Sequence, residues 1–241
     1  MTSESGGGTA VVVGVGGGLG AALVRRFAAA GMAVVASARG SGTIDALVKE
    51  IASKGGRALA VPADSVDEAQ VVNLFRATTT SFGPPDLVVY NAGAFRPKSI
   101  LETTPEDVET CFRVGALGGF LVGREAAKAM VARGSGTIIF TGATAALRGS
   151  ARFFNLAVGK FALRALAQSM ARELGPKGVH VAHVVVDGQI AGPYYRDLKK
   201  ERGPDALLEP DAIAETYWQV HRQHRSAWTQ ELDLRPWVEK F

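Results

Sequence analysis

Residues 11–20 read VVVGVGGGLG, a run of three valines followed by a turn in which glycine occupies most positions. An unbroken run of β-branched residues is typical of a strand that is buried on both faces of a sheet. Glycine permits a tight turn and a close approach of the backbone to a ligand, and a helix that starts directly afterwards offers unpaired N–H groups. A strand, a glycine-rich turn and a helix in this order therefore predict a site for the pyrophosphate of a dinucleotide.

The rest of the chain repeats this alternation of short apolar runs and longer helix-like segments. Strands that alternate with helices imply right-handed crossovers and a parallel sheet covered on both sides. We therefore expect an α/β fold of Rossmann type: a doubly wound parallel sheet of about seven strands, with helices on both faces, in a single domain over residues 1–241. The expected strands span residues 10–13, 33–38, 58–61, 87–90, 137–140, 179–186 and 228–232. The expected helices span residues 19–30, 44–53, 66–82, 105–132, 151–174 and 211–224.

One segment late in the chain interrupts this rhythm. Residues 193–208 contain two tyrosines, two prolines and a glycine between the sixth expected strand and the last expected helix. Proline and glycine at this density favour a loop. We expect an insertion that covers the substrate end of the site.

The composition is that of an ordinary globular protein, because 47% of the 241 residues are hydrophobic, 21% are charged and the formal net charge is +4. These values allow a sizeable core and do not favour a nucleic-acid partner. Residues 1–8 lack the layout of a signal peptide, and residues 10–24 are too rich in glycine and end too early, at Arg25, for a membrane span. The single Cys111 cannot form an internal disulfide, which indicates a cytoplasmic location.

The end of the second expected strand selects between cofactors. An acidic residue there would accept hydrogen bonds from the adenosine ribose and repel a 2′-phosphate. Residues 36–39 read ASAR, which has no acid and ends on the guanidinium of Arg39. Arg39 can pair with a phosphate and Ser37 adds a hydroxyl, so we expect NADP(H) rather than NAD(H). The alternative is that Arg39 only caps the loop.

Several motifs together make the chain resemble the short-chain dehydrogenase/reductase family over almost its whole length. The glycine spacing at positions 14, 18 and 20 is similar to that of the family, residues 91–93 read NAG like its cofactor-bordering motif, and residues 64–65 resemble its adenine-contacting position. The resemblance implies that cofactor binding falls on Gly14, Gly16, Gly17, Gly18, Leu19, Gly20, Ser37, Arg39, Asp64, Ser65, Asn91, Ala92, Gly93, Lys160, Gly188 and Ile190.

The same resemblance exposes a departure at the catalytic positions. In the family a Tyr and a Lys four residues later share one helix face, the ammonium lowers the pKa of the phenol, and a Ser and an Asn complete the proton-transfer groups. Lys160 matches the Lys and is the one catalytic residue retained. The Tyr, Ser and Asn positions hold Leu156, Ala143 and Gly115. Because leucine cannot donate a proton, the chain resembles a divergent member that has lost the usual route.

Other groups near these positions are candidates to replace the missing ones. Thr141 and Thr144 can stand in for the serine as hydrogen-bond donors, but not for the phenol as an acid. Tyr194 and Tyr195 are the candidates for a relocated phenol, and the alternative is that they pack as part of a lid.

The histidines are interpreted as structural. His180 and His183 lie inside an apolar expected strand, where a satisfied core histidine is more common than a base. Residues 221–225 read HRQHR and are interpreted as a solvated helix face. His221 and His224 have a spacing compatible with metal binding, but no further ligand is evident, so no metal site is expected.

Two functions remain open on this evidence. The first is an NADP(H)-dependent oxidoreductase that acts on an unknown small carbonyl or alcohol by an altered or weakened proton route. The alternative is a catalytically silent protein that binds NADP(H) as a sensor or partner subunit. The long expected helices 105–132 and 151–174 resemble the pair through which the family associates, so we expect a homodimer or homotetramer.

Overall fold

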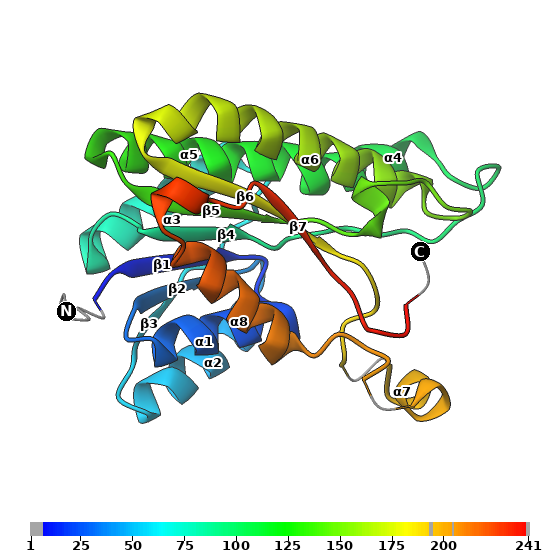
Figure 1. Cartoon of the computed structure of the whole chain (residues 1–241), viewed down its shortest axis with the longest axis horizontal. Coiled ribbons are helices and arrows are strands. Elements are labelled where there is room, and N and C mark those ends of the chain that lie inside the picture. Colours follow the sequence, from blue (N-terminus) through cyan, green and yellow to red (C-terminus); the bar gives the residue numbers. More distant parts are fainter. Residues whose placement is uncertain (1–6, 193–194, 204, 240–241) are drawn as a thin grey trace.

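The computed structural model describes residues 7–192, 195–203 and 205–239. Seven parallel strands form one sheet in the order β3-β2-β1-β4-β5-β6-β7, with helices on both faces (Figure 1). The predicted doubly wound α/β fold is therefore confirmed. The strands are β1 Thr9–Val13, β2 Ala33–Ser37, β3 Arg57–Ala60, β4 Leu87–Tyr90, β5 Gly136–Thr141, β6 Val179–Val186 and β7 Glu231–Leu234.

Two helical layers enclose the sheet. Figure 1 shows α1, α2 and α8 on one side of the sheet and α4, α5 and α6 on the other, and α3 packs against the same core as α5 and α6. The helices are α1 Leu19–Ala29, α2 Ser41–Ser53, α3 Glu68–Phe82, α4 Pro105–Phe112, α5 Gly118–Arg133, α6 Phe154–Leu174, α7 Arg196–Arg202 and α8 Pro210–His221.

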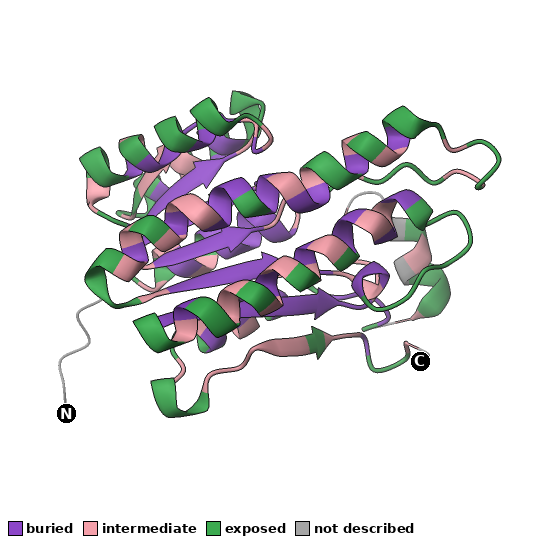
Figure 2. Cartoon of the chain, turned by 90° about the horizontal axis from the view of Figure 1, so that it is seen from above, coloured by how far each residue is buried: buried purple, intermediate pink, exposed green. Residues whose placement is uncertain are grey.

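The sheet is buried on both faces because its strands present apolar side chains alternately to the two layers. Val12 of β1 enters the core under α1 and α8, whereas Val11 and Val13 enter the core under α5 and α6. Figure 2 shows the result: the central strands are buried throughout, whereas the helices carry alternating buried and exposed positions. The edge strand β7 is only half-buried.

The start of α4 shows how the sequence sets a helix boundary. Thr104 accepts a hydrogen bond from the Asp107 N–H, and the Asp107 carboxylate accepts one from the Thr104 N–H. Pro105 occupies the first turn, where its missing N–H costs nothing. Among the described residues, no helix combines the length and apolar character that crossing a bilayer requires.

The expected helix 105–132 is wrong as a continuous α-helix. It consists of α4 and α5 joined by the π-helical segment Arg113–Leu117. Within this segment Gly115 lies against α6, so that close helix packing accompanies the irregular turn. The expected insertion 193–208 also differs from a plain loop, because its described part contains α7.

The starts of one strand and one helix also differ from those expected from the sequence. The expected strand 228–232 begins instead at Glu231, and the Trp228 ring before it stacks on His180 at a centroid distance of 4.8 Å. The expected helix 151–174 begins at Phe154, because Arg152 has a left-handed backbone with φ of 69°.

Candidate functional site

A cleft of about 500 Å³ lies at the sheet edge where the parallel strands end. Val13 is level with Ser37 and with Tyr90 in the paired strands, so the turns that follow β1, β2 and β4 share this edge. The cleft brings together predicted cofactor residues from separate turns, namely Gly14, Gly16, Arg39, Asp64, Ser65, Asn91, Ala92 and Gly93. The other predicted cofactor residues are not among the described residues that line it, namely Gly17, Gly18, Leu19, Gly20, Ser37, Lys160, Gly188 and Ile190.

The glycine turn is shaped by its own backbone. Gly14 has φ of 89°, and a Cβ placed on it would lie 2.4 Å from the Ala92 nitrogen. A Cβ at Gly20 would lie 2.7 Å from a backbone atom of the same turn, whereas residues 16–18 face open space. The Asn91 side chain donates to the Gly14 carbonyl at 3.0 Å, which joins two of the predicted motifs physically. The turn is therefore closed on the protein side and open toward the cleft.

Two polar residues at the end of β2 differ in their access to the cleft, because Arg39 lines it whereas Ser37 is fully buried and does not. The buried Ser37 hydroxyl has no hydrogen-bond partner among the described residues, and exposed Arg39 forms no ion pair with them. Asp64 shapes its own turn, because its carboxylate accepts from the Val66 N–H at 3.2 Å and its N–H donates to Gln70. An open glycine turn and a free guanidinium fit a dinucleotide that carries an extra phosphate.

Lys160 lies at the same edge of the sheet, near the ends of β4 and β5. Its side chain is buried, and its Nζ donates to the Thr141 carbonyl at 2.6 Å. A Cβ placed on Gly93 would lie 3.9 Å from the same nitrogen, so the ammonium sits between the ends of β4 and β5. Burial lowers the pKa of Lys160 to about 8. Such an amine exchanges its proton readily near neutral pH.

Leu156 and Gly115, which the resemblance placed at the tyrosine and asparagine positions, lie in different surroundings. Leu156 is half-buried on the first turn of α6. At Gly115 a Cβ would lie 2.7 Å from the Gly159 Cα, and a Cβ at Gly159 would meet the Cys111 carbonyl at the same distance. The two helices therefore touch through glycine backbones, and no asparagine side chain fits at position 115 without moving α6.

The strand end that would carry the serine is constrained from both faces. A Cβ at Gly142 would lie 2.4 Å from the His183 Nε2, and the next position holds Ala143. Before them, the Thr141 hydroxyl accepts from the Tyr217 phenol at 3.0 Å. Burial raises the pKa of Tyr217, which keeps the phenol neutral. Tyr217 was not foreseen, since a tyrosine inside an α-helical apolar pattern gives no signal of its partner.

The second expected serine replacement is also engaged. The Thr144 hydroxyl hydrogen-bonds the Asp187 carboxylate, and Asp187 lies 3.5 Å from the Arg235 guanidinium. A Cβ at Gly188 would meet the Pro236 ring at 2.9 Å. The C-terminal segment thus packs on the turn after β6, and neither threonine hydroxyl is left uncommitted.

The two core histidines are only half satisfied. His183 Nδ1 lies 2.9 Å from Glu231, and His180 Nε2 lies 2.8 Å from the Thr229 carbonyl. The other ring nitrogen of each has no partner among the described residues. Burial lowers the pKa of both, so both are neutral near neutral pH. Of the relocated-phenol candidates, Tyr195 is 39% exposed and Tyr194 lies outside the described residues.

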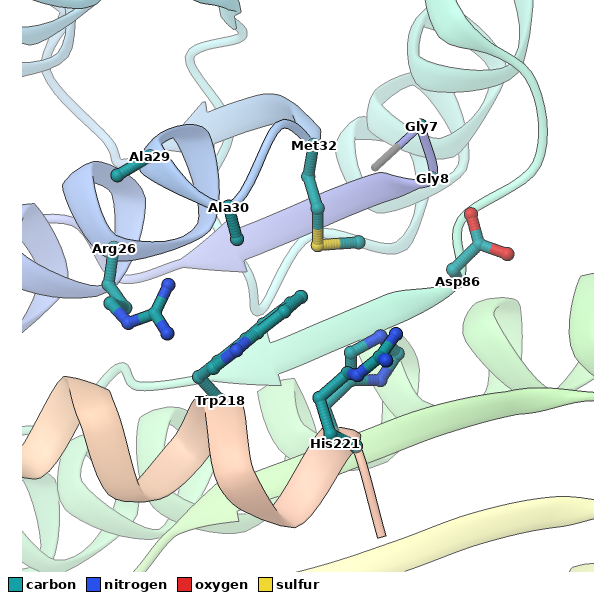
Figure 3. A pocket seen from close by; sticks show the side chains of 10 residues that line it. Gly7, Gly8, Arg26, Ala29, Ala30, Met32, Asp86, Trp218 and His221 are labelled. Carbon is teal, nitrogen blue, oxygen red and sulfur yellow. The ribbon is translucent and has the colours of Figure 1, made fainter. Parts of the chain in front are cut away.

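A second hollow, of about 570 Å³, lies at the opposite edge of the sheet where β1 begins (Figure 3). Arg26 from α1 and Trp218 and His221 from α8 point into it, opposite Met32 and Asp86. The Arg26 guanidinium lies over the Trp218 ring at 5.0 Å. No predicted cofactor residue lies here, so its larger volume does not make it the nucleotide site.

This hollow corrects the interpretation of residues 221–225 as a solvated helix face for His221 only, because Arg222, His224 and Arg225 are exposed although α8 ends at His221. His221 is half-buried, its Nδ1 lies 2.9 Å from the Thr137 hydroxyl, and burial lowers its pKa to about 4. His224 instead caps the short 3₁₀ turn Arg225–Ala227. In the described part of the chain no three metal-ligating side chains come together.

Comparison with known proteins matches this architecture to a family. Residues 8–201 match the family model described as short chain dehydrogenase. The chain belongs to the short-chain dehydrogenase family. A 3-oxoacyl-[acyl-carrier-protein] reductase of Synechocystis sp. is 33% identical over 193 residues, which cover 80% of this chain and 78% of that protein.

Solved structures of family members share the whole fold. A short-chain dehydrogenase from Rhodopseudomonas palustris is 40% identical, with a TM-score of 0.83 over 95% of this chain and 98% of that chain. A metagenomic short-chain oxidoreductase in complex with NADP is 26% identical, with a TM-score of 0.84 over 98% of this chain and 100% of that chain.

Proposed function

We propose that this family member is an NADP(H)-dependent oxidoreductase that interconverts a carbonyl and an alcohol by a proton route centred on Lys160. The observation that carries the proposal is the buried Lys160 ammonium between the ends of β4 and β5, beside a cleft that retains the glycine turn. Exposed Arg39 in the cleft supports the preference for the 2′-phosphorylated cofactor, and a similar protein is known in complex with NADP.

The proton chemistry follows from the environment of Lys160. When bound, the nicotinamide would supply or accept the hydride. In reduction the proton on the substrate oxygen comes from Lys160 Nζ through a bridging water, since Lys160 does not itself line the cleft, and the neutral amine regains a proton from solvent. The lowered pKa, about 8, favours such a transfer over that from an ordinary lysine. The hydrogen bond that Nζ donates to the Thr141 carbonyl holds the amine in place.

A specific observation favours a second function, that of a silent NADP(H)-binding protein. Gly115 lies against Gly159, so the asparagine position is closed by helix packing and is not merely substituted. Leu156 offers no proton donor at the tyrosine position. A fold that has lost these groups but keeps its cofactor turn is suited to sensing the cofactor or to completing a partner subunit.

Steady-state turnover separates the two functions. With saturating NADPH and a panel of aldehydes and ketones, the first function predicts measurable NADPH oxidation that falls about 10²-fold or more in Lys160→Met. The double variant Leu156→Tyr with Ala143→Ser is expected to raise the rate by restoring the usual acid. Bound NADPH with no turnover for any substrate selects the silent alternative.

The surface of the helices and the cysteine bear on assembly and location. Exposed aromatic side chains gather on the helices that the family resemblance assigns to association, namely Phe112 of α4, Phe120 of α5 and Phe161 of α6. We therefore propose a homodimer or homotetramer built on these helices. A free buried cysteine, Cys111, is consistent with the proposed cytoplasmic location.

A further inference from the structure

Residues 95–97, which follow β4, are held by contacts with residues just before α6 and in its first turn. The Arg152 guanidinium donates to the Pro97 carbonyl at 3.2 Å. The Phe95 and Phe153 rings pack with their centroids 4.6 Å apart. The fully buried Asn155 side chain donates to the Arg96 carbonyl and accepts from the Arg96 N–H. Three successive residues of the loop are thus each held by a different contact.

The backbone of this fastening is strained in a way that points to a function. Arg152 has φ of 69°, a left-handed conformation that is uncommon for a residue other than glycine. Such strain persists where surrounding contacts fix it, and it clusters at binding sites. A segment ordered before a ligand arrives loses less entropy on binding. The loop is therefore built to hold Phe95 and Arg96 in set positions.

Among the described residues around this loop, Arg96 is a cation that lines the cleft without a counter-ion. Lys98 pairs with Asp107 at 2.6 Å, and Glu102 feels the positive charges of Arg152 and Lys98. Arg96 lines the cleft and forms no ion pair with the described residues. Its guanidinium is a planar set of donors that matches a carboxylate through two hydrogen bonds.

The loop lies on the side of the cleft away from the adenosine residues. Arg39 and Asp64 follow β2 and β3, whereas segment 95–97 follows β4 and contacts the start of α6, the helix that carries Lys160. The Phe95 and Phe153 rings remain 37% and 39% exposed, so each offers an apolar face to a ligand. Aromatic faces and a free guanidinium thus stand together near the proposed proton donor.

We infer that the substrate is a carbonyl compound with an aryl body and a carboxylate, bound by Phe95 packing on the ring and by Arg96 pairing with the carboxylate. This inference rests on the proposed function for the site. It names Arg96 as the residue that selects acidic over neutral substrates, and segment 95–97 as the element that positions it.

Equilibrium binding tests this assignment without turnover. The probes are benzoylformate and 4-acetylbenzoate, each compared with its neutral methyl ester, and titrated by calorimetry into the full chain with saturating NADP⁺. At least one acid is expected to bind about tenfold or more tightly than its ester. Arg96→Gln is expected to abolish this difference and leave ester binding unchanged. Arg57→Gln, a matched loss of an exposed charge on the distant strand β3, is expected to preserve it.

The outcomes that overturn the inference are distinct from failure of the proposed function. Equal binding of both acids and their esters overturns the inference, as does an equal loss in Arg96→Gln and Arg57→Gln. If Arg96→Gln weakens NADP⁺ itself about tenfold, Arg96 belongs to the cofactor and the inference is also overturned. A chain that binds no NADPH overturns the proposed function, and titration of the probes without cofactor then still tests Arg96.

Discussion

At the scale of single residues, Lys160 is a buried cation with one carbonyl partner. Desolvation disfavours its charged form, and the hydrogen bond to the Thr141 carbonyl compensates only in part. In the family the neighbouring phenol makes use of this ammonium, but here the neighbouring position holds Leu156. Burial destabilises the charged form of Lys160 and lowers its pKa to about 8. This pKa is suited to proton transfer.

The burial of Lys160 predicts a pH-dependent stability. Its pKa falls from the ordinary 10.5 to about 8 on folding, so between these pH values the unfolded chain binds more protons than the folded chain. The free energy of unfolding should therefore rise with pH across this window, by about 1–3 kcal/mol relative to Lys160→Met, which lacks the group. Urea unfolding of both proteins at several pH values measures the difference. If the free energies of unfolding of the two proteins change with pH in parallel, burial does not destabilise the charged form of Lys160.

Gly115 predicts a second effect at this scale. Because a Cβ there would lie 2.7 Å from the Gly159 Cα, Gly115→Ala should force α6 away and destabilise the fold by about 1–3 kcal/mol. The control is Gly42→Ala in α2, where a Cβ meets nothing within 4 Å. That change should be neutral or stabilising because alanine favours helix. Equal effects of the two substitutions on the melting temperature would contradict the close helix contact.

At the scale of elements, β7 is attached to the sheet by side chains as well as by its ladder. Glu231 receives two hydrogen bonds from Arg164 of α6, at 2.6 and 2.7 Å, and faces His183 of β6. The lowered pKa of Glu231, caused first by Arg164, shows that the carboxylate is the favoured form. One acid thus joins an edge strand, a central strand and a helix.

Glu231→Gln tests this connection. The substitution keeps the shape but removes the charge that Arg164 and His183 face, so it should reduce the free energy of unfolding by about 1–3 kcal/mol. The matched control is Glu173→Gln, which breaks the exposed pair with Lys177 and should cost less than about 0.5 kcal/mol. Denaturant unfolding measures both. A loss no larger than that of the control would mean that β7 depends on its backbone ladder alone.

The expected and observed helices and strands show which features of the fold can be predicted from the sequence. Apolar runs and glycine turns predicted the first six strands to within about one residue at each end but the seventh only in part, because burial and backbone freedom are local signals. The seventh strand begins after Trp228, which stacks on His180 from a distant part of the chain, and no local signal predicts such a contact. The same holds for the site: the cofactor turns were predictable, but the partners of Thr141 and the fastening of Arg96 by Asn155 depend on tertiary contacts.

At the scale of the whole molecule, the apolar surface on α4, α5 and α6 predicts assembly. Phe161 of α6 is exposed beside a stretch of small residues, and burying such rings between subunits is favourable. Phe161→Asp should therefore shift the protein toward monomer, and Val72→Asp, which alters an equally exposed residue on α3, should not. Light scattering after gel filtration gives the masses. A wild-type protein that is already monomeric would contradict the proposed assembly.

The cleft as a whole places one guanidinium at each end, Arg39 beyond β2 and Arg96 beyond β4, with the open glycine turn between them. This arrangement suits two ligands. One is a long dinucleotide whose adenosine end is anionic, and the other is a small anion at the opposite end of the cleft. Cofactor binding is therefore the first property to test and turnover the second, since the glycine turn is open toward the cleft.

The most direct test is equilibrium titration of the full chain with NADPH and with NADH, followed by protein fluorescence. The account predicts that NADPH binds about tenfold or more tightly than NADH, and that Arg39→Gln removes this preference while Arg57→Gln retains it. A wild-type chain that binds neither nucleotide, or that binds NADH as tightly as NADPH, would contradict the central claim.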